Sequence, residues 1–201
     1  MRKSKLLRIV QFGFCFIGLS ALSYSGMRVG SAFLYQSEQI RKFQPGSSTP
    51  KSTTLRPGSF DNPSVQPVPN GVSFARLDIP RLGLADVIVE GDDEKSLRKA
   101  IGHIPETALP GNSGNVGLAG HRDTFFRPLQ DIRKGDIILI KTSQDVYRYE
   151  VESSEIVLPR DSWVLNDTKQ PSLTLVTCFP FHFIGSAPKR FVVHARQVPL
   201  P

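Results

Sequence analysis

Hydrophobic and polar residues alternate with a period of two directly after Val72. In "SFARLDIP" (residues 73–80), Ala75, Leu77 and Ile79 share one face, the pattern of a strand with one buried side. Further runs with the length and composition of strands are residues 85–91, 115–121, 135–142, 145–157, 172–178 and 190–198. Short strands separated by Gly/Pro turns predict an all-β domain, built as an antiparallel barrel or sandwich.

Only a short part of this domain has a helical pattern. The segment "DEKSLRKAIGHI" (93–104) predicts one short helix, with Asp92 or Asp93 available to cap its first turn. Residues 30–43 form a second candidate helix, which would continue an apolar segment that precedes it.

That apolar segment predicts a membrane anchor. Residues 1–8 carry four basic side chains, and the 19 residues from Ile9 to Met27 carry no charge. A helix of this length spans about 28 Å, close to the thickness of a bilayer core. The basic cluster predicts a cytoplasmic segment 1–8, a transmembrane anchor 9–29 and an extracytoplasmic remainder. The alternative is a signal peptide cleaved near residues 21–23, but apolar residues continue beyond that site.

The rest of the N-terminal extension is predicted to be a stalk and linker, residues 30–71, which ends in a Pro/Ser/Thr-rich stretch. The whole net charge of +7 lies in residues 1–71, which hold nine basic and two acidic residues. Residues 72–201, the predicted β-barrel domain, hold 16 of each and are neutral. A neutral domain argues against nucleic-acid binding.

The chain has two cysteines, and Cys15 lies in the apolar segment. Cys178 is therefore the single cysteine of the exported domain, where structural cysteines usually form pairs. It ends the strand 172–178, and Pro180 turns the chain away two residues later. This placement favours a thiol presented at the rim of the barrel over a buried filler.

A reactive thiol needs a base and a cationic partner nearby. His121 follows Gly117 and Gly120 at a strand end, where catalytic residues are often placed. Arg190 begins the last strand and would meet Cys178 at one end of the barrel if the last two strands are neighbours, where it could hold an oxyanion.

The other three histidines have less specific settings. His103 near the predicted helix end is expected to make structural hydrogen bonds, and His194 is expected to lie on a strand surface. His182, in an aromatic loop, could line a substrate entrance or simply pack among phenylalanines.

Three segments resemble the signature segments of sortases: "GLAGHRDTFFRPLQDIRKGD" (117–136), "TLVTC" (174–178) and "APKRFVV" (187–193). The segment "ETALPGNSGNVGLAGH" (106–121) extends the similarity, which covers about residues 72–198 and is most like class D or a related housekeeping-type sortase. "HRD" also occurs in protein kinases, but the other kinase motifs are absent.

The resemblance implies a sortase-like eight-stranded β barrel with one or two short helices, preceded by an N-terminal membrane helix. It implies a cysteine transpeptidase that needs no cofactor or metal; the calcium site of some sortases is not carried over. Cys178 would attack the Thr–Gly or Thr–Ala carbonyl of an LPxTG-type sorting signal, His121 would transfer protons, and Arg190 would bind substrate and oxyanion. Candidate substrate-binding residues are Thr177, His182 and Ala119, although a Thr in an alternating strand is often only a strand residue.

The implied partners are sorting signals of secreted surface proteins, an amine acceptor in the cell wall or on a pilin, and membrane lipid around residues 9–29. Two other classes stay open. One is a different exported cysteine acyltransferase, such as an L,D-transpeptidase, although the "SHGC"-like motif of that class is absent. The other is a non-catalytic anchored β domain with Cys178 as a buried filler.

Overall fold

The structure is a computed structural model that describes residues 19–20, 23 and 68–200. The predicted cytoplasmic segment, membrane anchor, stalk and linker lie almost wholly outside the described residues. Within these ranges, no helix has the length and apolar character needed to cross a bilayer.

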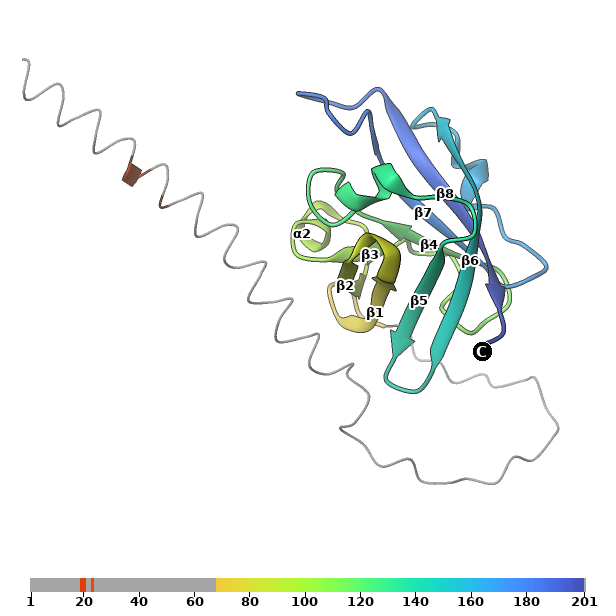
Figure 1. Cartoon of the computed structure of the whole chain (residues 1–201). Helices are drawn as coiled ribbons and strands as arrows, with labels where there is room; N and C mark the ends of the chain where they lie inside the picture. Colours follow the sequence, from red (N-terminus) through yellow and green to blue (C-terminus); the bar gives the residue numbers. More distant parts are fainter. Residues whose placement is uncertain (1–18, 21–22, 24–67, 201) are drawn as a thin grey trace, which may run out of the picture.

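Eight strands close into a barrel, as the sortase resemblance implied (Figure 1). Around the barrel their order is β1-β2-β3-β4-β7-β8-β6-β5, and β5 pairs with β1 to close it. The strands are β1 Ser73–Ile79, β2 Leu84–Glu90, β3 Ile101–His103, β4 Asn115–Ala119, β5 Ile137–Thr142, β6 Val146–Val157, β7 Ser172–Phe179 and β8 Lys189–Val198. The described helical elements are short: α2 Glu94–Leu97 and the 3-10 turns η1 Pro80–Leu82, η2 Arg127–Asp131 and η3 Ser162–Leu165.

The interior of the barrel follows from the period-two pattern. Leu118, Leu175 and Val193, on three adjacent strands, are fully buried in one apolar core. Their neighbours in sequence therefore face outward, because successive side chains of a strand point to opposite sides of the sheet. The outer face of β4, β7 and β8 is the surface on which the candidate site is built.

Two strand pairs depart from the antiparallel barrel that the pattern predicted. β2 pairs with β3 in parallel, and β4 pairs with β7 in parallel. Parallel neighbours need a long crossover connection, and the segment from β4 to β7 includes the complete β5–β6 hairpin. Alternation within single strands does not reveal such pairing.

The predicted helix 93–104 is wrong in its second half. The helix ends at Leu97, after Asp93 caps its first turn through the main-chain N–H groups of Lys95 and Ser96. Ile101–His103 is strand β3, and all three of its residues are buried. Pairing of β3 with β2 and β4 overrides the local helical pattern. A Cβ at Gly102 would lie 2.4 Å from the main-chain oxygen of Gly91, so this position requires glycine.

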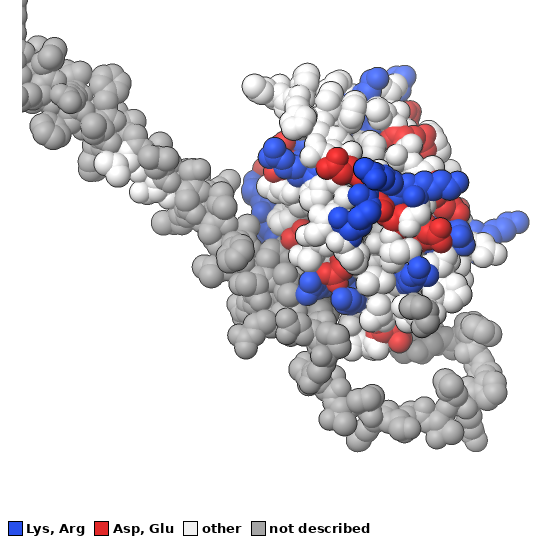
Figure 2. Space-filling model, in the orientation of Figure 1, with Lys and Arg blue, Asp and Glu red and all other residues white. Residues whose placement is uncertain are grey.

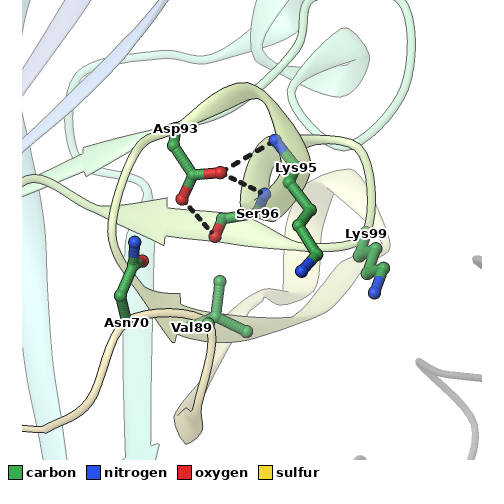
Figure 3. Close-up of a pocket in the computed structure, with 7 residues that line it drawn as sticks. Asn70, Val89, Asp93, Lys95, Ser96 and Lys99 are labelled. Atoms are coloured by element: carbon green, nitrogen blue, oxygen red, sulfur yellow. Dashed lines mark hydrogen bonds between the residues drawn. The ribbon is translucent and has the colours of Figure 1, made fainter.

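The chain enters the barrel beside α2. The main-chain N–H of Gly71 donates to the oxygen of Glu90, whose own N–H donates to Val72. A pocket of about 250 Å³ lies where this entry meets α2 and β2 (Figure 3). Its lining includes Asn70 and Asp93 and none of the candidate catalytic residues.

Charges of both signs are interleaved on the face of the barrel seen in Figure 2, in agreement with its zero net charge. Two carboxylates respond to their surroundings in opposite ways. Hydrogen bonds from Arg81 hold the pKa of the buried Asp136 below its ordinary value. Burial raises the pKa of Asp86 to about 6, although the positive charge of Arg76 lowers this pKa and offsets part of the rise.

These shifts predict opposite effects of two matched substitutions. A lowered native pKa makes Asp136 stabilising above about pH 4, with the contribution lost as the pH falls, whereas a raised native pKa makes charged Asp86 destabilising as the pH rises from about 4 to 6. Urea unfolding at pH 7 should therefore show Asp136→Asn less stable, and Asp86→Asn more stable, than the parent protein. The Asp86→Asn difference should shrink as the pH falls from about 6 to 4, and the Asp136→Asn difference should shrink only below about pH 4. The same sign for both variants at pH 7 would contradict this account.

Candidate active site

The parallel pairing of β4 with β7 places His121 next to Cys178. Ala119 lies opposite Val176, and the N–H of Gly120 donates to the oxygen of Val176 at 3.2 Å. The Thr177 hydroxyl then donates to the oxygen of Gly120 at 2.7 Å. Because the two strands run parallel, the same register continues past Ala119 and Val176 and places His121 beside Cys178.

The antiparallel pairing of β7 with β8 brings Arg190 to the other side of the thiol. Cys178 and Arg190 are direct partners in the β7–β8 register. Adjacent strands lie about 4.8 Å apart, so His121, Cys178 and Arg190 form a row that runs from the end of β4 across β7 to β8. The expectation that the last two strands are neighbours is confirmed.

One groove of about 380 Å³ contains all three side chains. Ala119 and Thr177 also line it, so the structure brings five of the six predicted site residues together. The remainder of the lining is largely apolar, with Asp92, Asp161 and Ser162 as its charged and hydroxyl side chains. Its apolar side chains come from α2, the residue after β3, the end of β6, the segment between β6 and β7, and the strands β7 and β8: Leu97, Ile104, Val157, Leu158, Pro159, Val164, Leu165, Val176 and Val192. This composition suits an extended peptide with apolar side chains.

Asn115 holds the wall of this groove in place. Its side-chain amide donates to the main-chain oxygens of Val164 and Asn166, both at 3.3 Å, on and just after η3. Its side-chain oxygen accepts from the Thr174 hydroxyl at 2.9 Å. The sequence did not identify Asn115 as a functional residue. The one feature that could have indicated it is a polar residue at the start of an otherwise apolar strand.

Arg190 and Cys178 are both accessible. Cys178 is a free thiol and is partly exposed at the end of β7. One terminal nitrogen of Arg190, Nη1, donates to the main-chain oxygens of Lys189 at 3.0 Å and Ala187 at 3.4 Å. Within the described residues, Nε and Nη2 of Arg190 have no hydrogen-bond partner and remain free for a substrate oxygen.

The other histidines lie elsewhere. His103 is buried, with Nδ1 2.9 Å from Glu90 Oε2 and Nε2 3.1 Å from the oxygen of Ala108, so its expected structural role is confirmed. His194 lies on a strand surface as expected, with Nε2 2.9 Å from Glu155 Oε1. His182 is exposed in the loop after β7 and is not part of the groove lining, so its role in substrate binding stays a prediction.

The row of side chains supplies the parts of nucleophilic acyl transfer. A thiol forms the covalent bond, an imidazole beside it moves protons, and a guanidinium stabilises negative charge on an attacked carbonyl. Among residues 68–200, no cluster of three or more His, Cys, Asp or Glu side chains is arranged to hold a metal ion.

Comparison with known proteins agrees with this geometry. The sortase domain model matches residues 77–198. Sortase D of Bacillus subtilis is 28% identical over 185 residues, covering 90% of this chain and 93% of its own. The Clostridium perfringens Sortase D5 transpeptidase superposes with a TM-score of 0.61 at 33% identity, covering 66% of this chain and 83% of its own. Sortase A from Corynebacterium diphtheriae gives 0.61 at 30% identity, with 65% and 62% covered. The chain therefore belongs to the sortase family of cysteine transpeptidases, and it is similar to class D sortases.

Proposed function

We propose that this protein cleaves an LPxTG-type sorting signal through an acyl-thioester on Cys178 and transfers the acyl group to an amine. The observation that carries the proposal is the register across β4, β7 and β8, which aligns His121, Cys178 and Arg190 in one groove. Membership of a family of cysteine transpeptidases supports the reaction type.

The reaction follows from the order of the three side chains. The Cys178 thiolate attacks the carbonyl carbon of the signal's threonine, and the C–N bond to the next residue breaks as the imidazolium of His121 protonates the leaving amine. An incoming amine then attacks the thioester, gives its proton to His121, and releases the Cys178 thiolate as the new amide forms. The bond energy of the first amide is retained in the thioester, so no energy source is consumed.

Arg190 is suited to the tetrahedral intermediates of both steps. Its free Nε and Nη2 groups stand on the opposite side of Cys178 from His121. A planar guanidinium can donate two parallel hydrogen bonds, one to the oxyanion and one to a peptide oxygen. We therefore assign Arg190 to substrate and oxyanion binding and His121 to proton transfer.

The apolar wall of the groove supports a peptide substrate with an apolar side chain ahead of the scissile bond. Val164 and Leu165, on η3, pack with Val176 and Val192 on the sheet. Burying one leucine-sized side chain against such a wall contributes about 1.5–3 kcal/mol of binding free energy. The leucine and proline of an LPxTG-type signal match this surface.

The setting of the reaction is part of the same proposal. Residues 1–8 and 9–29 would hold the protein in the cell membrane as a single-pass anchor, and residues 30–71 would carry the barrel outside the cytoplasm. The donor would then be the sorting signal of a secreted protein. The acceptor would be an amine of the cell wall or of a pilin subunit, giving surface-protein anchoring or pilin polymerisation.

The proposal predicts amine-dependent cleavage of a fluorogenic LPxTG-type peptide panel. Cys178→Ala should abolish turnover and His121→Ala should lower kcat/KM by about 10²- to 10⁴-fold, because general acid–base catalysis contributes that much. The matched histidine control is His194→Ala, which lies outside the groove and should stay within a few fold of the parent protein. Parent-level turnover in His121→Ala would refute the mechanism. Activity confined to peptidoglycan tetrapeptides would favour the L,D-transpeptidase alternative.

The exposure of Cys178 predicts that the folded protein reacts with a small thiosulfonate. Mass spectrometry of peptides from residues 72–201 should show one adduct, on Cys178, under conditions in which the protein remains folded. Cys178→Ser provides the blank. Labelling of Cys178 only in denaturant would instead identify it as a buried filler.

A further inference from the structure

Arg122, the residue after His121, buries its guanidinium although no buried carboxylate neutralises it. The side chain is 7% exposed, and its carboxylate neighbour, Asp123, lies 3.4 Å away and is 72% exposed. A buried cation is costly unless hydrogen bonds replace its hydration. The partners of Arg122 therefore have to be sought elsewhere.

The partners are main-chain oxygens of the loop between β7 and β8. Nη1 donates to Pro180 at 3.0 Å, and Nη2 donates to Phe183 at 2.6 Å and to Gly185 at 3.3 Å. The guanidinium carbon also lies 5.8 Å from the centre of the Phe183 ring, within the range of a cation–π contact. One side chain thus contacts three positions spread over six residues of the loop.

This loop has little else to hold it. In the described part of the chain, residues 180–187 form hydrogen bonds only through main-chain oxygens. The donors are the side chains of Arg122 and Arg190. At its first end, Phe181 packs against Phe191 with ring centroids 5.3 Å apart. Ile184, at the middle of the loop, is fully exposed.

The loop connects the strand of Cys178 to the strand of Arg190. Arg122, the residue after His121, attaches this loop to the His121 turn through hydrogen bonds. The loop begins two residues after the thiol and ends two residues before Arg190. Within the loop, Ala187 accepts from Nη1 of Arg190 at 3.4 Å, so the loop also contacts the Arg190 side chain. Movement of the loop would alter the position of Arg190 relative to Cys178.

We propose that Arg122 is a positioning residue that fixes the β7–β8 loop against the His121 turn and so keeps Arg190 directed at the carbonyl attacked by Cys178. Its effect on catalysis rests on the proposed function; its effect on the loop does not. The planar fork of arginine is required because one group must reach three oxygens, which a lysine ammonium at the end of a flexible stem does not do.

The test compares Arg122→Met and Arg122→Lys in the full-length protein in detergent micelles. Backbone amide order parameters of residues 181–188, measured by NMR, should fall in both variants while those of β4 and β7 keep parent values. With the LPxTG-type peptide, kcat should fall about tenfold to a hundredfold, as expected for a misplaced catalytic group, and KM should change less than threefold. A purely structural loss would instead lower the active fraction and leave kcat per labelled Cys178 unchanged.

Two further variants keep the test decisive if Arg122→Met does not fold. Phe183→Ala removes only the ring contact, so it should lower the order parameters of the loop by a smaller amount than Arg122→Lys. Asp123→Asn removes the exposed carboxylate and should leave both the order parameters and kcat at parent values. Unchanged loop order parameters in Arg122→Lys would overturn the proposal. Lowered loop order parameters in a protein whose parent form cleaves no peptide would support the contact between Arg122 and the loop and count against the proposed function and the catalytic effect.

Discussion

The whole site depends on the parallel pairing of β4 with β7 next to the antiparallel pairing of β7 with β8. The first pairing sets His121 beside Cys178, and the second sets Arg190 on the other side. A shift of one residue in either register would turn an active side chain toward the barrel interior, because the side-chain period of a strand is two. The apolar core under these strands fixes the register, since Leu118 and Leu175 must stay inside.

Two segments beside this frame are each held by a polar side chain that donates to main-chain oxygens. Asn115 holds the turn η3, which forms the apolar wall, and Arg122 holds the loop between β7 and β8. Thr177 bonds the oxygen of Gly120 from beneath the groove. The frame thus aligns His121, Cys178 and Arg190, and η3 supplies part of the apolar wall of the groove.

Most of the strands could be predicted from the sequence. Strand β3, the parallel pairings and the hydrogen bonds that hold the loops could not, for physical reasons. Alternation and short apolar runs between turn residues located seven of the eight strands, and Pro180 located the end of β7. The three residues of β3 are too few for a period to show, and their pattern merges with the helix before them. Parallel pairing is non-local, and the oxygens to which Asn115 and Arg122 donate are main-chain atoms, which leave no pattern in the sequence.

The central claim is that His121, Cys178 and Arg190 act as one unit because the strand register aligns them. The most direct measurement is a double-mutant cycle on kcat/KM for an LPxTG-type peptide, using His121→Ala, Arg190→Ala and the combined variant. Groups that act as one unit are strongly non-additive. The account predicts that the combined variant loses only about as much activity as the worse single variant. Multiplication of the two single losses would contradict it.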